Sequence, residues 1–381
     1  MNKLNHILFL CSWYPNKVQK TNGNFIEKHA QAVATLNKVS VLNIQPVKGL
    51  KNIEIKCSRT ENLLTIILYI PQQEGKYFAS IKKYFSYKKT YKLGVEIAEK
   101  EMGDINLVHL NHVFPLGALA LFQSVPFVVS EHYSAFLNPI NRLTKNKIKL
   151  ASSVFNKAKF VFPVSETLKN GISKLSLSHS RLKVIGNVVD TAIFNLKGKQ
   201  IPEKTHFIHI SNGDEDAKNL LGILNAIKQL TKHTNQFQFT FICDGDIKKQ
   251  HEKARELGLL NSFVFFEKEK SQTEIAQLLK NSTALVMFSN YETFGIVTAE
   301  ALACGTPVIA TEIAATQELV HPNFGILVPC DDTTKLANAM LAIIENTNPY
   351  PIEEMHQFIA SNFSKEQIAQ SFQSYYNQIV K

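Results

Sequence analysis

Few features of this 381-residue sequence point to disulfides, metal centres or membrane spans. Its five cysteines lack paired or metal-ligand spacing, and their odd number leaves at least one unpaired. Apolar runs such as 118–122 and 284–288 fall far short of the roughly 18 residues that a membrane-spanning helix needs. Residues 7–11 are apolar, but no small-residue cleavage site precedes Trp13. We therefore expect a buried first strand and a cytoplasmic protein.

The composition is that of a folded globular protein, with 45% hydrophobic and 19% charged residues. At roughly 100–200 residues per domain, the length predicts two domains. A polar, turn-rich stretch at 195–205 places the linker near residue 200. We expect an N-terminal domain over 1–198, a C-terminal domain over 199–360, and a final helix within 361–381 that packs back toward the N-terminal domain.

Short apolar runs alternate with helical stretches in both halves, which indicates an α/β fold with parallel sheets covered by helices on both faces. Two such doubly wound sheets in tandem predict a ligand cleft between the domains, at the carboxyl ends of the strands. The expected strands are 7–11, 38–42, 107–110, 127–129, 160–164, 207–210, 239–243, 263–266, 284–288 and 307–310.

The net charge of +10 is divided unevenly. Residues 1–200 contain 28 Lys and Arg against 11 Asp and Glu, which leaves residues 201–381 with a net charge of −7. The densest basic stretch, 76–92, carries aromatic residues between its lysines, which suits an anionic surface such as lipid headgroups. A solvated helix whose aromatic rings pack inward explains the pattern equally well. No helix-turn-helix, zinc or RNA-stacking motif argues for a nucleic-acid partner.

The most specific segment, 289–311, begins after an apolar run and contains two carboxylates, Glu292 and Glu300. Glu300 falls inside an expected helix over 296–304, and Glu292 precedes this helix. Eight residues of straight helix span about 12 Å and return to nearly the same face, so one ligand could touch both carboxylates. The free N–H groups next to Gly295 suit phosphate oxygens. A helix cap at Glu292 and an exposed Glu300 are the alternative interpretation.

This segment resembles the Glu-x7-Glu signature of the group 1 (family 4) retaining glycosyltransferases, which use nucleotide sugars. Further segments resemble the landmarks of this family in the same order: 108–117, 130–132, 161–165, 184–194, 243–246, 258–266 and 325–328. The resemblance implies the GT-B fold of two Rossmann-like domains that face each other across a cleft. It assigns the acceptor to the N-terminal domain, 1–198, and the nucleotide sugar to the C-terminal domain, 199–360. It also implies sugar transfer from a nucleotide diphosphate donor to a hydroxyl acceptor, a glycan or a lipid-linked molecule, with retention of the anomeric configuration.

The resemblance implies a role for each matching residue in the C-terminal half. Glu300 would hold the ribose hydroxyls of the nucleotide, and Glu292 the hydroxyls of the donor sugar. The backbone amides of Phe294 and Gly295 would approach the sugar and the diphosphate. Lys218 would neutralise the leaving diphosphate, whose negative charge grows in the transition state.

In the N-terminal half, the resemblance places His132 in the donor-sugar pocket and Gly23 in a loop that approaches the phosphates with its backbone. A core histidine and a simple turn are the respective alternatives. We expect structural roles for His109 and His112. Together these assignments predict Glu292, Lys218 and His132 as catalytic residues and Gly23, Phe294, Gly295 and Glu300 as donor-binding residues.

Two departures from the family pattern concern the donor. Residues 211–213 lack the usual arginine, and Ala314-Ala315 replaces the usual Gly-Gly. The strings Asp244-Gly245-Asp246 and Asp214-Glu215-Asp216 match a metal-binding Asp-x-Asp pair, but this match is unspecific. We expect no metal and no cofactor beyond the nucleotide-sugar substrate. A sugar-nucleotide epimerase and a non-catalytic sugar- or nucleotide-binding relative remain alternatives, and the basic N-terminal half predicts a peripheral position at the anionic inner face of a membrane.

Overall fold

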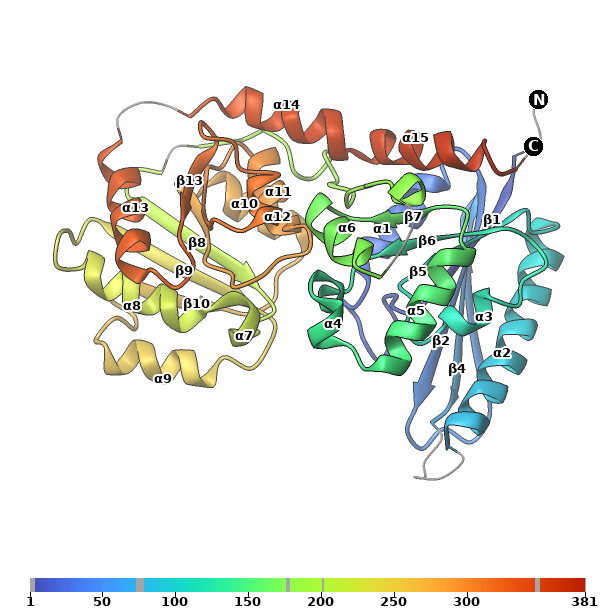
Figure 1. Ribbon diagram of the computed structural model, residues 1–381. Helices are drawn as coiled ribbons and strands as arrows, with labels where there is room; N and C mark the ends of the chain where they lie inside the picture. The colour runs from blue at the N-terminus through green and yellow to red at the C-terminus, as the bar shows by residue number, and fades with distance from the viewer. Residues whose placement is uncertain (1–3, 73–78, 176–178, 201, 347–349, 381) are drawn as a thin grey trace. The chain divides into compact units, whose positions relative to one another are not determined.

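The computed structural model describes the chain except for residues 1–3, 73–78, 176–178, 201, 347–349 and 381 (Figure 1). It divides into two units. Unit 1 consists of residues 1–188 and 365–381, and unit 2 of residues 189–364. This division precedes the linker expected near residue 200, and the last helix belongs to unit 1. Over the described residues, no helix has both the length and the apolar character that a membrane span requires.

Unit 1 is built on a seven-stranded sheet in the order β3-β4-β2-β1-β5-β6-β7. Every pair of neighbouring strands is parallel except β3 and β4. All six residues of β1 are buried, as expected for a central strand covered on both faces, whereas all of β3 at the edge is exposed. The strands are β1 (His6–Cys11), β2 (Lys38–Val47), β3 (Glu54–Arg59), β4 (Leu63–Pro71), β5 (Leu107–Asn111), β6 (Phe127–Glu131) and β7 (Val161–Pro163).

The final helix of the chain packs against the first helix of unit 1. Asn37 Nδ2 donates to Gln373 Oε1 at 2.6 Å, and Tyr376 is buried. The helices of unit 1 are α1 (Asn24–Val33), α2 (Ala79–Met102), α3 (Gly117–Ala120), α4 (Pro139–Arg142), α5 (Lys145–Lys157), α6 (Glu166–Ser173) and α15 (Lys365–Tyr376), with 3-10 turns η1 (Ser134–Leu137) and η2 (His179–Arg181).

Unit 2 contains a six-stranded, fully parallel sheet in the order β10-β9-β8-β11-β12-β13. Its strands are β8 (Thr205–Ser211), β9 (Phe237–Cys243), β10 (Val264–Glu267), β11 (Ala284–Met287), β12 (Val308–Thr311) and β13 (Gly325–Val328). Its helices are α7 (Glu215–Lys218), α8 (Leu220–Leu230), α9 (Lys248–Glu256), α10 (Gln272–Lys280), α11 (Ile296–Ala303), α12 (Ala314–Gln317), α13 (Thr333–Glu345) and α14 (Ile352–Phe363). Phenylalanines of β8 and β9 belong to its hydrophobic core.

The two sheets share one topology. When the edge strand β3 is set aside, the strands of each unit lie in the chain order 3-2-1-4-5-6, the Rossmann order. This result confirms the predicted α/β fold with two Rossmann-like domains. The strand order reverses between β1 and β5 in unit 1 and between β8 and β11 in unit 2, and such sheets bind ligands beyond the carboxyl ends of the strands at that point.

Candidate active site

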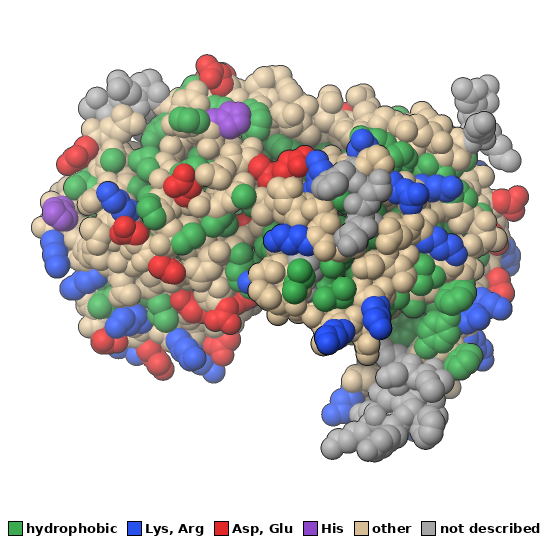
Figure 2. All heavy atoms as spheres, viewed as in Figure 1, with side chains coloured by type: hydrophobic (Ala, Val, Ile, Leu, Met, Phe, Trp, Pro, Cys, Tyr) green, Lys and Arg blue, Asp and Glu red, His purple; other side chains and the backbone are tan. Residues whose placement is uncertain are grey.

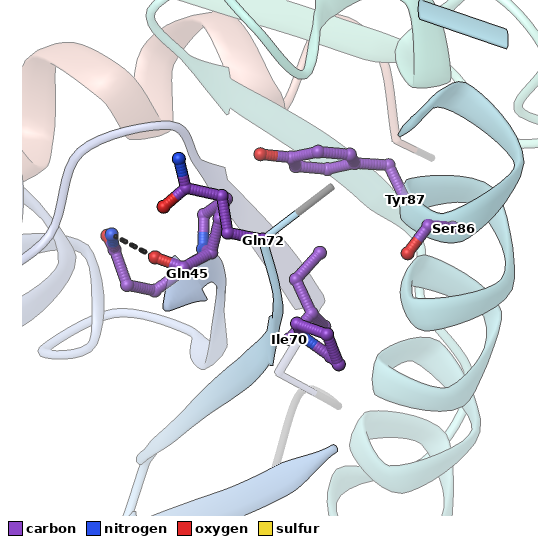
Figure 3. A pocket seen from close by; sticks show the side chains of 7 residues that line it. Gln45, Ile70, Gln72, Ser86 and Tyr87 are labelled. Carbon is purple, nitrogen blue, oxygen red and sulfur yellow. Dashed lines mark hydrogen bonds between the residues drawn. The ribbon is translucent and has the colours of Figure 1, made fainter. Parts of the chain in front are cut away.

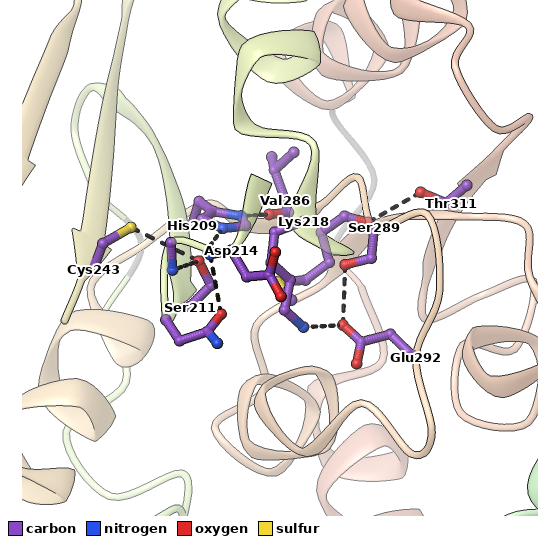
Figure 4. Close-up of polar contacts among 12 residues, drawn as sticks. His209, Ser211, Asp214, Lys218, Cys243, Val286, Ser289, Glu292 and Thr311 are labelled. Carbon is purple, nitrogen blue, oxygen red and sulfur yellow. Dashed lines mark hydrogen bonds and ion pairs between the residues drawn. The ribbon is translucent and has the colours of Figure 1, made fainter. Parts of the chain in front are cut away.

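An ion pair lies at the switch point of unit 2. Lys218, the last residue of α7, follows β8, and Glu292 lies in the loop after β11. Lys218 Nζ is 2.5 Å from Glu292 Oε1, and Ser289 Oγ donates to the same oxygen at 3.0 Å (Figure 4). The two side chains are only 17% and 11% exposed. The structure thus brings together two of the three residues predicted to be catalytic.

The backbone holds this pair in place. Asn290 N donates to Ala217 O at 2.8 Å, and Asn290 Nδ2 donates to Asp216 O at 2.9 Å, so the loop after β11 is tied to α7. Asn219 takes the left-handed conformation, with φ of 50°, and its side chain caps α8 by accepting from Gly222 N. Because both segments are tied together, the separation of Lys218 and Glu292 follows from the backbone.

His209, a buried histidine on β8 near Lys218, was not predicted as a site residue from the sequence motifs. His209 Nδ1 donates to Val286 O at 2.8 Å, so its Nε2 accepts from Ser211 Oγ at 2.9 Å. Ser211 Oγ in turn accepts from Gly213 N (Figure 4). Burial lowers the pKa of His209 to about 4, and the charge of Lys218 contributes to the decrease. A neutral imidazole therefore orders the loop that leads to Lys218.

Glu300 and the residues around Gly295 belong to α11 and its N-terminus. Gly295 is the N-cap, with φ of +85°, and Phe294 is buried against Phe363 at a ring-centroid distance of 5.2 Å. Glu300 is only 7% exposed, which contradicts its interpretation as an exposed helix residue. The helix begins at Ile296, so Glu292 lies outside it and the expected helical spacing does not relate the two carboxylates.

Gly23 ends the loop between β1 and α1 in a conformation that favours glycine. Its φ is +80°, and a Cβ atom at this position would lie 2.6 Å from the carbonyl carbon of Trp13. The packing of this loop on itself therefore requires glycine. The role of Gly23 toward donor phosphates stays a prediction.

His132 follows β6 and is buried beside other rings. Its ring centroid is 4.6 Å from that of Phe25 and 5.6 Å from that of His29. Burial holds the pKa of His132 well below its usual range, and the nearby His29 lowers it further. Neither ring nitrogen has a partner of hydrogen-bonding geometry among the described residues, although Asn187 is close enough to raise the pKa by a small amount. His132 is thus a neutral imidazole with free hydrogen-bonding capacity.

His109 and His112 follow different patterns. His109 is fully buried, and its nitrogens lie 2.6 Å from Tyr376 Oη and 2.7 Å from Ser130 Oγ, contacts that give it a structural role. His112 instead pairs with Glu131, which is fully buried, at 2.7 Å. Neither Glu131 nor Trp13, which stacks on His112, was among the predicted site residues. The position of Glu131 directly before His132 was the available signal.

A hollow in unit 1 lies between the last residues of β2 and β4 and helix α2 (Figure 3). Its volume is about 240 Å³, somewhat below the roughly 300–1,000 Å³ of typical small-molecule sites. Burial raises the pKa of Tyr87 to about 12, so this phenol stays protonated. The side chains around the hollow are uncharged: Gln45, Pro46, Ile70, Pro71, Gln72, Ser86 and Tyr87.

The acidic strings considered as metal ligands lie at the surface. Asp244 and Asp246 are exposed after β9, and Asp214 and Asp216 are exposed around the start of α7. Within the described part of the chain, no three His, Cys, Asp or Glu side chains are grouped so that they could hold a metal ion.

Residues 79–92 of the basic, aromatic stretch belong to α2, and this helix has both inward-packed and exposed aromatic residues. Tyr87 and Tyr91 are buried, whereas Phe85 is 62% exposed beside the exposed Lys88 and Lys89. Phe122 is 70% exposed, and Lys88 Nζ lies 6.0 Å from its ring centroid. Hydrophobic side chains next to lysines are visible over α2 and α3 in Figure 2. Lys76 and the side chains of Lys82 and Lys83 lie outside the described part of the structure.

Comparisons with known proteins decide the family. Residues 193–364 match the profile described as glycosyl transferases group 1, and residues 70–193 match that of glycosyltransferase family 4. The two matches together run through well over half of the chain. The chain is a group 1 glycosyltransferase.

Similar proteins agree with this assignment. An uncharacterized glycosyltransferase of Methanocaldococcus jannaschii is 27% identical over 352 residues, which cover 84% of this chain and 87% of the relative. The N-acetyl-alpha-D-glucosaminyl L-malate synthase of Bacillus anthracis is 23% identical over 58% of this chain and 60% of its own length.

Solved structures establish the fold of this glycosyltransferase as GT-B. Sucrose-phosphate synthase from Thermosynechococcus elongatus superimposes with a TM-score of 0.78 at 18% identity, covering 98% of this chain and 99% of the other. HepE of Anabaena, in complex with UDP and glucose, gives a TM-score of 0.75 at 18% identity, with 98% and 100% covered. At these identities the likeness concerns the fold alone.

Proposed function

We propose that this glycosyltransferase moves a sugar from a nucleoside diphosphate sugar to a hydroxyl acceptor, with retention at the anomeric carbon and without a metal ion. The observation that carries the proposal is the Lys218–Glu292 pair at the switch point of unit 2. The bond that breaks joins an anionic diphosphate to a sugar that carries hydroxyl groups. Lys218 is suited to the diphosphate because it is a cation, and Glu292 is suited to the sugar because a carboxylate accepts hydrogen bonds from hydroxyl groups.

Lys218 would bind the diphosphate and stabilise the charge that the leaving group gathers. A lysine that already faces a carboxylate at 2.5 Å is pre-oriented, so an incoming phosphate would share or replace Glu292 as its partner. Glu292 would then accept hydrogen bonds from sugar hydroxyls. Glu300, on α11, would accept those of the ribose.

We assign His132 to a hydroxyl group of the sugar. Its neutral ring has unused hydrogen-bonding capacity, which suits a sugar hydroxyl better than a phosphate. The uncharged Asn212 stands in the segment where the family arginine is missing, so Lys218 would supply most of the phosphate charge neutralisation. HepE of Anabaena, which shares the fold, was crystallised with UDP and with UDP-glucose, which makes uridine donors the first to test.

A donor screen by thermal shift in the presence of EDTA tests the proposal. A ligand at 100 times its Kd stabilises the folded state by about 2.7 kcal/mol. NMR of the transfer product then reports the anomeric configuration. Three outcomes would contradict the proposal. A melting temperature that no nucleotide changes would contradict the nucleotide-sugar donor, and an inverted product would contradict retention. Activity that is lost in EDTA and restored by a divalent ion would contradict the reaction without a metal ion. Donor turnover to an isomer without acceptor would instead identify an epimerase.

Two matched variants separate the carboxylates. Glu300→Gln should weaken binding of the free nucleoside diphosphate, whereas Glu292→Gln should mainly lower kcat, because only Glu292 is assigned to the sugar. Each lost hydrogen bond to a charged group should cost about 1.5–3 kcal/mol. Equal effects of both variants on nucleoside diphosphate binding would contradict the assignment.

A further inference from the structure

Two aromatic side chains meet at the switch point of unit 1. Trp13 follows β1 and His112 follows β5, and their rings stack with centroids 3.9 Å apart at an interplanar angle of 30°. Trp13 is half-buried, as are Phe25 and Tyr133, which contact it edge-on. The place where this topology binds ligands is therefore lined by a partly exposed aromatic surface.

Glu131 determines which nitrogen of His112 carries a proton. The buried carboxylate accepts from the backbone N–H groups of Val113, His132 and Tyr133 at 2.9–3.1 Å. The carboxylate oxygens of Glu131 are the acceptors in all of these bonds, so His112 Nδ1 is the donor in the 2.7 Å hydrogen bond to Glu131 Oε1. In the neutral ring, His112 Nε2 is then a hydrogen-bond acceptor.

The free atoms of this pair are complementary to a hydroxyl group. His112 Nε2 and the indole N–H of Trp13 have no hydrogen-bond partner among the described residues, and neither atom is fully sealed from solvent. A hydroxyl is both a donor and an acceptor, so it can donate to Nε2 and accept from the indole. The apolar face of a sugar or cyclitol ring can lie on the aromatic surface at the same time.

The backbone at His112 is held in an uncommon conformation for a residue other than glycine. Its φ is +67°, in the left-handed region. His112 N donates to Ser130 O at 2.9 Å, and Ser12 Oγ donates to His112 O at 3.0 Å. Conformations of this kind persist where surrounding contacts determine them, and they cluster at functional sites.

We propose that Trp13 and His112 form the recognition site for the acceptor, a ring-shaped polyol such as a sugar or a cyclitol, and that Glu131 is a positioning residue that fixes the tautomer of His112. The identity of this ligand as the acceptor rests on the proposed function. The binding chemistry rests on unit 1 alone, so the two can fail separately.

Trp13 is the single tryptophan of the chain, so fluorescence reports the site directly. The probes are methyl glucosides, mannosides, galactosides and N-acetylglucosaminides of both anomers, together with myo-inositol, titrated to tens of millimolar, the range of weak ligands. We expect at least one to change the emission of the wild type saturably. Its Kd should rise about tenfold in His112→Asn, as for the loss of one hydrogen bond.

Asparagine suits this substitution because it tolerates the left-handed conformation. His6→Gln is the matched control, since His6 is a buried histidine on β1 that bonds Gly103 O and Ser40 Oγ away from the site. This variant should bind the probe like the wild type. If no probe changes the emission, or if His112→Asn binds the responding probe as tightly as the wild type, the proposal is wrong.

Kinetics separate a recognition role from a structural one. With the responding probe as acceptor, His112→Asn, Trp13→Phe and Glu131→Gln should each raise the acceptor KM by a larger factor than they change the donor KM or the Kd for UDP. Equal loss of donor hydrolysis and transfer would overturn the site. A saturable fluorescence response without any nucleotide binding would leave the site intact and refute the proposed function instead.

Discussion

Units 1 and 2 have the same strand order, yet their switch points carry opposite chemistry. Unit 2 presents an ion pair, Lys218 and Glu292, whose charges are suited to a diphosphate and a polar sugar. Unit 1 presents rings: His132 is neutral, and Trp13 stacks on His112. Glu131, the carboxylate that contacts His112, is buried and accepts three backbone N–H groups.

This difference shows what the shared topology determines and what it leaves free. The parallel sheet decides where side chains converge, because the first and fourth strands of each unit end at the switch point. The side chains after those strands decide which ligand is bound. A duplicated scaffold can therefore offer a charged site for the donor and an uncharged site for the acceptor.

The largest expected effect comes from removing the cation of unit 2. Lys218→Met should lower kcat about 10²–10³-fold, because the lysine opposes charge that develops in the transition state. Binding of a free nucleoside, which lacks phosphates, should change far less. Steady-state kinetics and thermal shift on the same protein samples measure both quantities.

Lys199→Met is the control for this substitution. Lys199 is another largely buried lysine of unit 2, and it bonds Thr306 Oγ1 and Ser282 O away from β11's carboxyl end. Burial lowers its pKa to about 8. Its replacement should alter stability and leave kcat per folded molecule unchanged. Wild-type turnover by Lys218→Met would refute the role of Lys218.

The next largest expected effect is a loss of stability at low pH that is greater in unit 1 than in unit 2. Burial lowers the pKa of His29 in unit 1 to about 4, and it also lowers the pKa values of His6, His109 and His132, whereas in unit 2 only His206 and His209 are affected among the described residues. Between pH 6.5 and 4 the unfolded chain binds protons that these folded rings do not, so stability falls as the pH falls through this window. The lowered pKa of His29 alone should reduce the free energy of unfolding by about 3 kcal/mol across this pH range.

Urea unfolding at pH 7 and pH 5 checks this prediction. Trp13 fluorescence reports unit 1, and far-UV circular dichroism reports both units. At pH 5 the fluorescence midpoint should decrease more than the dichroism midpoint. His29→Gln should reduce this pH dependence. Coincident midpoints that shift equally would show that the excess of buried imidazoles in unit 1 has no effect.

Alanine substitutions of two loop glycines should differ less in their effect on the free energy of unfolding. Gly23 and Gly295 both precede a helix with positive φ, so alanine costs about 1–2 kcal/mol at either position. At Gly23 the new Cβ would also meet the backbone of Trp13 at 2.6 Å, whereas at Gly295 the nearest atoms are 3.6 Å away. Gly23→Ala should therefore lower the free energy of unfolding more than Gly295→Ala, and only Gly23→Ala should shift Trp13 emission. The reverse order would contradict this explanation.

The strongest patterns in the sequence predicted the scaffold but not every strand. Apolar runs identified the central strands such as β1 and β11, because burial on both faces leaves continuous hydrophobic sequence. β3 was missed because it is an exposed edge strand without such a run, and β4 was not assigned although Leu63–Pro71 is largely apolar. β13 was noted as a family segment and not as a strand.

The candidate site shows the same limit. Lys218 and Glu292 could be proposed from their motifs, and the structure shows them paired. The role of Glu131 depends on three backbone N–H groups and on the ring of His112, and no local spacing encodes such convergence. Likewise, the need for glycine at position 23 arises from Trp13, ten residues earlier, which only the folded loop brings into contact.

The smallest expected effect of a single substitution is on membrane binding by the lysines of unit 1, the half of the chain with the positive net charge. We propose that unit 1 binds an anionic membrane surface, where a lipid-linked or envelope glycan would be presented. The exposed Phe85 and Phe122 lie with Lys88 on one part of unit 1, which combines apolar and cationic groups. Each lysine near an anionic leaflet contributes about 1 kcal/mol, and salt weakens this contribution.

Vesicle co-sedimentation tests the membrane proposal with a matched pair of double variants. Lys88→Gln/Lys89→Gln should reduce binding to anionic vesicles at low salt, and binding to neutral vesicles should be weak throughout. Lys248→Gln/Lys249→Gln, an exposed lysine pair at the start of α9 in unit 2, removes the same charge and should bind like the wild type. If both double variants lose binding equally, net charge alone is responsible and α2 is not a membrane-binding element. If the wild type does not sediment with anionic vesicles even at low salt, the basic charge of unit 1 serves a soluble anionic acceptor instead, and the glycosyltransferase assignment is unaffected.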